Sequence, residues 1–129
     1  MQDNKKDLLH TIVNAIQDKK GQQIVICSLE HLHNAICDDF IVCQGNTRNQ
    51  VEAIAGNIGH EVYDKMQMKP FAINGEDNAL WIAIDYGDVM VHVFQPQARK
   101  FYDLEHLWAD AQLTCLPDLD CIAVQNTNN

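Results

Sequence analysis

The sequence lacks a long apolar segment, which restricts the kind of protein it can encode. Its longest uninterrupted apolar run, Ala79 to Ile84, has six residues, whereas a membrane-spanning helix needs about 20. The stretch from Met1 to Asp7 mixes acids, amides and lysines, unlike a secretory or organelle presequence. We therefore expect a cytoplasmic protein without a membrane contact.

Basic residues are also scarce. Nine Lys and Arg face eighteen Asp and Glu, for a formal charge of -9, and the basic residues cluster only as Lys5-Lys6, Lys19-Lys20 and Arg99-Lys100. Binding to a phosphate backbone depends on clustered cations, so we expect no direct nucleic-acid binding. An acidic surface is instead attracted to basic proteins, although taken alone the acidity is better explained as a charge that keeps the protein soluble.

No Cys-x-x-Cys pair occurs among the five cysteines, which are Cys27, Cys37, Cys43, Cys115 and Cys121. An odd number at these spacings argues against a disulfide framework and a zinc knuckle. Cys27 and Cys43 lie inside apolar runs, where reduced cysteines usually pack as small hydrophobic residues. The cysteines therefore suggest packing and no chemistry.

The N-terminal half predicts two helices and two strands. Leu8 to Ile16 has helical spacing, with Asp3 or Asn4 as the expected cap and Gly21 as the stop. Two short β-branched runs, 24–27 and 40–43, predict buried strands. Thr47 and Gln50 have capping-box spacing, and an apolar stripe then continues to about Met68. Gly56 and Gly59 interrupt that stripe, and each costs about 1 kcal/mol relative to Ala, so packing is expected to offset them.

The C-terminal half predicts a short strand at 71–73 and a β-hairpin. Segments 80–84 and 89–94 flank a turn in which Gly87 can adopt positive φ. Pro96 can start a helical turn, and Asp103 is the expected N-cap of a helix over 104–111. The overall prediction is a single α/β domain over 1–116, with helices packed on a mixed sheet of about five strands. Residues 117–129 form a loosely ordered tail in this prediction.

Three stretches resemble the ribosomal silencing factor family, also called RsfS or Iojap-like proteins. They are 39–47, the segment from Trp81 to Phe94, and YDLEHLW at 102–108. The resemblance covers roughly 8–111 and implies a nucleotidyltransferase-like fold without catalytic apparatus or cofactor. It also implies binding to large-subunit ribosomal protein fourteen, which keeps the small subunit from associating and represses translation under nutrient limitation.

The resemblance suggests a partner-binding surface in which aromatic residues act as anchors and acids meet Lys and Arg of the partner. His92 also has a second interpretation, as a buried, hydrogen-bonded residue. The residues assigned to this surface are Asp85, Tyr86, Asp88, His92, Tyr102, Asp103, Glu105 and Trp108.

Two alternatives remain open at this stage. Asp85 and Asp88 could hold magnesium in a nucleotidyltransferase-like enzyme, although the chain lacks a Gly-Ser followed closely by Asp-x-Asp, and acids at the ends of a hairpin turn have a simpler structural explanation. We expect no metal site and no catalysis. The aromatic surface could also pair with itself, which would make the free protein a homodimer.

Overall fold

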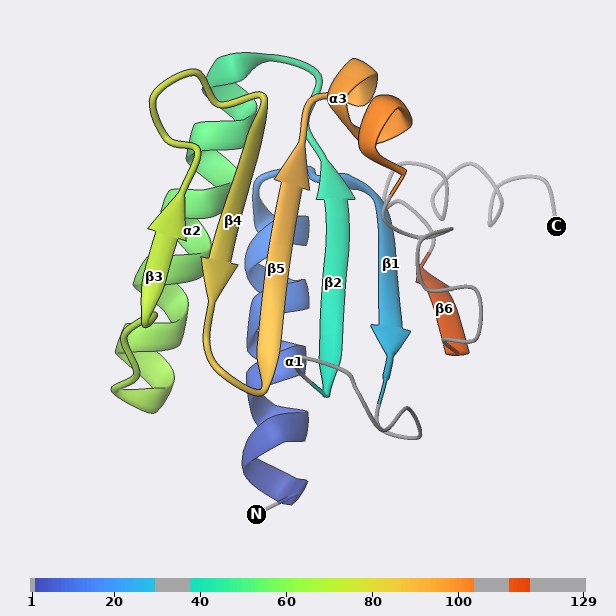
Figure 1. Cartoon of the computed structure of the whole chain (residues 1–129). Helices are drawn as coiled ribbons and strands as arrows, with labels where there is room; N and C mark the ends of the chain where they lie inside the picture. Colours follow the sequence, from blue (N-terminus) through green and yellow to red (C-terminus); the bar gives the residue numbers. More distant parts are fainter. Residues whose placement is uncertain (1, 30–37, 104–111, 117–129) are drawn as a thin grey trace, which may run out of the picture.

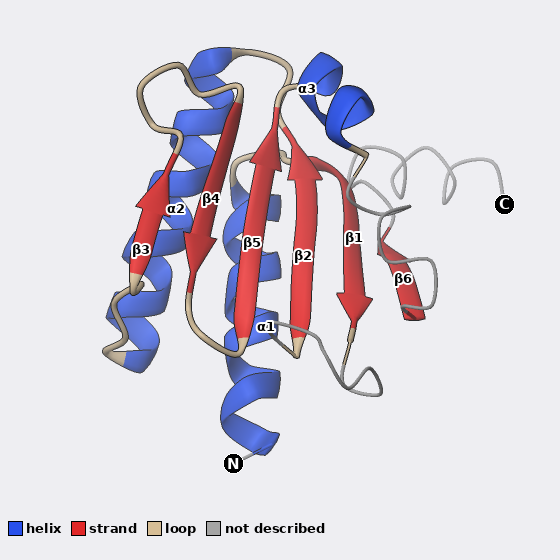
Figure 2. Ribbon diagram, in the orientation of Figure 1, coloured by secondary structure: helices blue, strands red, loops and turns tan. Residues whose placement is uncertain are grey.

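The computed structural model describes residues 2–29, 38–103 and 112–116 as one sheet with helices on one face and at one end (Figures 1 and 2). The elements are α1 (Gln2–Asp18), β1 (Gln22–Ser28), β2 (Asp39–Gln44), α2 (Arg48–Met66), β3 (Ala72–Asn74), β4 (Trp81–Asp85), β5 (Val89–Phe94), α3 (Pro96–Tyr102) and β6 (Gln112–Leu116). None of the helices in these ranges is long and apolar enough to span a bilayer.

The sheet is mixed, as predicted, with the strand order β3-β4-β5-β2-β1-β6. β2 and β5 are parallel, and the other neighbouring strands are antiparallel. A parallel pair requires a crossover connection, and the chain between β2 and β5 provides it through α2 and the β3–β4 hairpin. The sixth strand, β6, was not predicted; it pairs with β1 in a register that places Leu116 opposite Ile24.

The start of α1 differs from the prediction, whereas its end agrees with it. The helix begins at Gln2, so the predicted caps Asp3 and Asn4 lie inside it. At the other end Lys20 takes a positive φ of 61°, and the Gly21 amide donates to the Ile16 carbonyl at 2.9 Å. A Cβ on Gly21 would collide with the Ile16 side chain, so glycine lets the chain leave the helix without displacing that side chain.

The predicted start of α2 is confirmed. The Thr47 hydroxyl accepts a hydrogen bond from the Gln50 amide at 3.1 Å. The Gln50 side chain reaches back to the Asn46 amide at 2.7 Å, one residue before the position a capping box uses. Gln50 also donates to the Lys20 carbonyl at 3.0 Å, which links the start of α2 to the end of α1.

The apolar side chains form two clusters on opposite faces of the sheet. The larger cluster lies under α1 and α2 and includes Ile12, Ile54 and Ile82. The smaller cluster lies on the other face, around Phe40 and Phe94. Cys27 and Cys43 are buried, as predicted, and burial raises the pKa of the Cys43 thiol to about 12. α1 and α2 therefore cover the same face, whereas the third helix contributes Ala98 to the cluster on the opposite face.

The β4–β5 hairpin is confirmed in type and position. Gly87 has φ +88°, and the Tyr86 amide donates to the Val89 carbonyl at 2.9 Å. An Asp85 carboxylate oxygen accepts from the Gly87 amide at 2.7 Å, the local side-chain bond that favours Asp in turns. After β5, Pro96 occupies the first turn of α3, also as predicted.

Candidate partner-binding face

The register of β4 and β5 brings aromatic side chains together on the face turned away from α1 and α2. Successive residues of a strand point to opposite faces. Trp81 is therefore on the other side of β4 from Ile82, which packs in the helix-covered core. Trp81 is paired with Phe94. His92 is two residues before Phe94 on β5, on the same face, and is paired with Ala83. These neighbours can interact across the strands.

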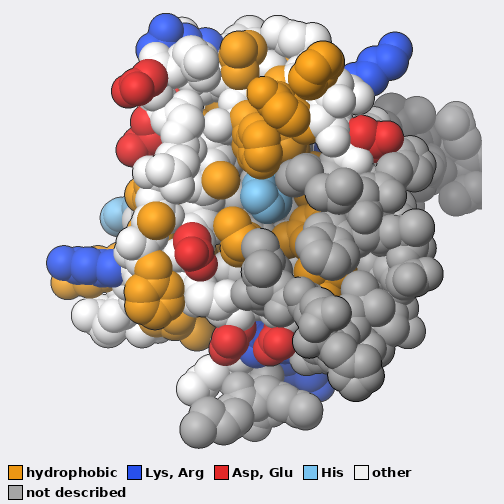
Figure 3. Space-filling view, in the orientation of Figure 1, with side chains coloured by type: hydrophobic (Ala, Val, Ile, Leu, Met, Phe, Trp, Pro, Cys, Tyr) orange, Lys and Arg blue, Asp and Glu red, His pale blue; other side chains and the backbone are white. Residues whose placement is uncertain are grey.

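Tyr102, at the end of α3, completes this cluster. Its ring lies 4.6 Å from that of Trp81 and 6.5 Å from that of Phe94, measured between centroids. The Trp81 and Phe94 rings are stacked at 5.1 Å with 23° between their planes. We call Trp81, His92, Phe94 and Tyr102 the aromatic face. Figure 3 shows hydrophobic side chains gathered around a histidine on this side of the molecule.

A hydrogen bond orients the Trp81 indole. Its Nε1–H donates to Nδ1 of His92 at 3.0 Å, so the neutral imidazole carries its proton on Nε2. His92 is only 8% exposed, and burial lowers its pKa to about 4. The structure therefore matches the second of the two interpretations, because His92 is buried and hydrogen-bonded to Trp81.

The aromatic face is only partly accessible. Phe94 is fully buried, whereas Tyr102 is 50% exposed and its neighbour Phe101 is 81% exposed. Trp81 is half-buried because Phe94, His92 and Tyr102 surround it. The surface thus has an ordered aromatic base with two exposed rings beside it.

Acidic side chains lie at both ends of this region. Asp85 ends β4, half-buried, and Asp88 is exposed in the following turn. Asp103 is exposed beyond Tyr102 and adopts the left-handed conformation, with φ 49° and ψ 51°. Asp103 ends α3, and its amide donates to the Arg99 carbonyl; the helix that it was predicted to cap, 104–111, lies outside the described residues.

Tyr86 is separated from the aromatic face. Its side chain is 3% exposed and packs in the helix-covered core, where burial raises its pKa to about 12. Its hydroxyl has no hydrogen-bond partner among the described residues. A buried ring cannot serve as a surface anchor in this conformation. Glu105 and Trp108, together with the predicted helix over 104–111 and the tail, lie outside the described residues.

The geometry gives little support to a metal site at the hairpin. Magnesium sites in enzymes use carboxylates that are free to face the ion, whereas one Asp85 oxygen is taken by the Gly87 amide. Across residues 2–29, 38–103 and 112–116, no three His, Cys, Asp or Glu side chains come together as a metal-binding group. Turn formation accounts for the Asp85 carboxylate.

The sequence interpretation missed Trp81 and Phe94 as members of the aromatic face, and it missed the exposed neighbour Phe101. Trp81 had a usable signal, because alternation along Trp81-Ile82-Ala83-Ile84-Asp85 places Trp81 and Asp85 on one face. Phe101 had none, since an aromatic residue beside Tyr102 in a short helix is equally compatible with the core.

Comparisons with known proteins agree with the resemblance seen in the sequence. Residues 2–129 match the family model described as "Ribosomal silencing factor during starvation". The chain is 40% identical to the ribosomal silencing factor RsfS of Halalkalibacterium halodurans, over 82% of this chain and 89% of that protein. It is 38% identical to RsfS of Bacillus subtilis, over 91% and 95%. A crystal structure of a Chromobacterium violaceum protein superposes with a TM-score of 0.76 at 28% identity, covering 81% of this chain and 85% of that one.

Proposed function

Because the chain belongs to the ribosomal silencing factor family, we propose that it binds ribosomal protein fourteen on the joining face of the large subunit. Bound there, it would prevent association of the small subunit and repress translation when nutrients are limiting. The observation that carries this proposal is the aromatic face, which is ordered by its own contacts and bordered by acids. The name shared by its relatives denotes regulation and not catalysis.

The exposed rings supply the affinity in this proposal. Interface hot spots are rich in Trp and Tyr, and truncating one typically costs about 2 kcal/mol or more. Tyr102 offers half of its surface and rests on Trp81, so little side-chain entropy is lost when a partner covers it. Trp81 is held by His92, and this hydrogen bond preorganises the centre of the surface.

The acids contribute orientation and association rate. The chain carries a formal charge of -9, and Asp88 in the β4–β5 turn and Asp103 at the end of α3 are both exposed. Complementary charges at the edge of an interface mainly accelerate association, and salt weakens their effect. Inhibition itself would be steric, since the small subunit cannot occupy the space that the bound protein fills.

Sedimentation of purified subunits tests the anchor. The protein is expected to comigrate with the large subunit in a sucrose gradient and to reduce the fraction of joined ribosomes. Tyr102→Ala should weaken comigration by about 30-fold in affinity, the equivalent of 2 kcal/mol. Tyr63→Ala is the matched control, because Tyr63 is 48% exposed on α2. Wild-type protein that stays at the top of the gradient, or equal behaviour of the two variants, would contradict the proposal.

Charge reversal tests the acidic border. Asp88→Lys and Asp103→Lys should slow association with the large subunit, most clearly at low salt. Asp64→Lys, an exposed acid on α2, makes the same change in net charge away from the aromatic face. If all three variants associate at the same rate, net charge and not its position controls binding, and the assigned border is wrong.

A further inference from the structure

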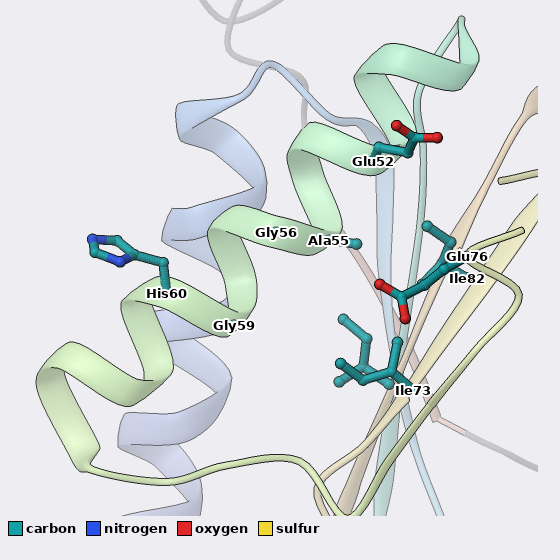
Figure 4. Close-up of a pocket in the computed structure, with 9 residues that line it drawn as sticks. Glu52, Ala55, Gly56, Gly59, His60, Ile73, Glu76 and Ile82 are labelled. Carbon is teal, nitrogen blue, oxygen red and sulfur yellow. The ribbon is translucent and has the colours of Figure 1, made fainter.

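A hollow lies between α2 and the β3–β4 hairpin, on the side of the sheet away from the aromatic face (Figure 4). It has a volume of about 500 Å³, within the size range of protein binding sites. Its lining comes from α2, β3, β4 and the loop between these strands: Glu52, Ala55, Gly56, Gly59, His60, Ile73, Glu76, Ile82 and Ile84. We call it the α2–β3 groove.

Two glycines in the wall of this groove have no packing explanation. Gly56 and Gly59 lie inside α2, where glycine is less favourable than alanine. No close approach requires either glycine, because a Cβ built on either residue would meet no atom within 4 Å. The packing that can offset their cost is on the buried side of the same helix, at Val51, Ile54, Ile58 and Val62. Neither glycine has the positive φ that would require this residue type. Their absent side chains leave the groove wider than the fold needs.

The groove has firm walls. The Arg48 guanidinium pairs with Glu52 at 2.9 Å and donates to the Asp77 carbonyl at 2.8 Å, which ties the loop after β3 to the first turn of α2. Gly75, in that loop, has φ +94° and lies too close to the Trp81 backbone to carry a side chain. A site with such constraints does not need to be ordered when a ligand arrives.

The lining indicates what would fit. Ile82 and Ile84 form a buried apolar floor, and Ile73 is 41% exposed beside them. Figure 4 shows the Glu52 carboxylate near the start of α2 and the Glu76 carboxylate further along the groove, beside Ile73, while the His60 ring points away from the sheet. Within the described ranges Glu76 has no ion-pair partner. β3 is an edge strand, and all three of its residues are exposed.

We propose that the α2–β3 groove docks a segment of a basic protein, which inserts an aliphatic side chain between Gly59 and Ile73 and places Lys or Arg beside Glu76. Ile82 and Ile84 would contact the aliphatic group, and the Glu76 carboxylate would pair with the cation. A polypeptide is favoured because the outer edge of β3 offers unpaired main-chain groups to an added segment. The proposal is independent of the aromatic face, which lies across the sheet.

A model peptide tests the groove without any ribosome. The probe is a nine-residue peptide of alternating Lys and Leu, titrated into ¹⁵N-labelled full-length protein, with a Lys–Ser peptide of equal charge as its control. The Lys–Leu peptide should shift amide signals of α2 and β3 and bind more tightly than its control. Shifts confined to the aromatic face, or equal binding of both peptides, would overturn the proposal.

Substitution of Gly59 separates docking from folding. Gly59→Ala and Gly59→Leu add progressively larger side chains to open space, so both variants should melt at or above the wild-type temperature. Peptide affinity should nevertheless fall in the order of side-chain size, by about tenfold or more for leucine, as expected when a packed site is overfilled. If affinity is unchanged in the folded Gly59→Leu protein, the peptide does not occupy the groove.

A matched pair of substitutions tests the role of Glu76. Glu76→Gln should weaken the Lys–Leu peptide by about threefold, whereas Asp64→Asn on the outer part of α2 should not. Equal losses of affinity would show that only net charge matters and that Glu76 does not contact the peptide. Peptide-independent self-association through this surface, detected by light scattering, would contradict a basic partner as its occupant.

Discussion

His92 should make the stability of the fold depend on pH between about 4 and 6.5. Its pKa is about 4 in the folded protein against an ordinary value of 6.5, so in this range the unfolded chain binds more protons than the folded one. The free energy of unfolding then rises with pH. It should be greatest above pH 6.5 and fall as the pH is lowered towards 4.

The size of the effect follows from the shift. One unit of pKa corresponds to 1.36 kcal/mol, so lowering the pH from about 7 to about 4.5 should remove about 2 kcal/mol of stability through this residue. Solvent screening reduces this free energy only slightly, because His92 is 8% exposed. Protonation also places a hydrogen on Nδ1, so the bond from the Trp81 indole is lost in the same range.

Urea unfolding at the two pH values measures this loss of stability, and the His92→Gln variant serves as the comparison. Glutamine does not titrate and keeps an oxygen that can accept from Trp81. The variant is expected to be less stable at neutral pH, but the difference between the two proteins should shrink by about 2 kcal/mol at the lower pH. If both proteins lose equal stability, His92 does not titrate as its burial implies, and the argument for a neutral, fixed ring fails.

Two further predictions concern the fold. Thr47→Ala should destabilise the protein by about 1 kcal/mol in urea unfolding, because the hydroxyl that caps α2 is lost; Thr47→Ser should restore most of it, and equal stability of all three proteins would contradict the cap. Cys43 should resist thiol reagents in the native state because it is buried and its pKa is raised to about 12. Mass spectrometry of the peptide that contains Cys43 should show labelling only after unfolding, and rapid native labelling would contradict its buried position.

Elements with local chemical signals were predictable from the sequence. The hydroxyl of Thr47 and the amide of Gln50 are close in sequence and act together, so the start of α2 could be predicted. Gly87 and Pro96 likewise indicated a turn with positive φ and a helix start, because each residue type favours that backbone conformation. In each case the stabilising interaction joins residues at most four positions apart, so no knowledge of the tertiary structure is needed.

Elements that depend on distant partners were harder to predict. β6 exists as a strand because it pairs with β1, nearly ninety positions away in the chain, and nothing local in QLTCL requires that. Asp103 was assigned as an N-cap because Asp commonly starts helices. In the structure Asp103 also ends α3 in a left-handed conformation, and no local signal in the sequence predicts that.

The candidate site shows the same division. Alternation places Trp81 and His92 on one face of the hairpin, but β5 is apolar on both of its faces, so the pattern cannot tell which face the helices cover. Tyr86 is adjacent to an exposed turn glycine, and only the packing of α1 and α2 reveals that its ring is buried beneath them. Sequence thus identified the hairpin as important without separating its surface residues from its core residues.

The alternation of β4 also determines how the two proposed surfaces relate. Trp81 and Asp85 face the aromatic side, whereas Ile82 and Ile84 form the floor of the α2–β3 groove. A single strand therefore contributes to both surfaces from opposite faces, and the sheet separates their occupants. A partner that covers Tyr102 does not have to displace a segment docked near Gly59, so the two proteins could be bound at once. Because a slip of one residue in β4 would exchange its two faces, the register that Gly87 sets in the hairpin turn is a requirement shared by both sites.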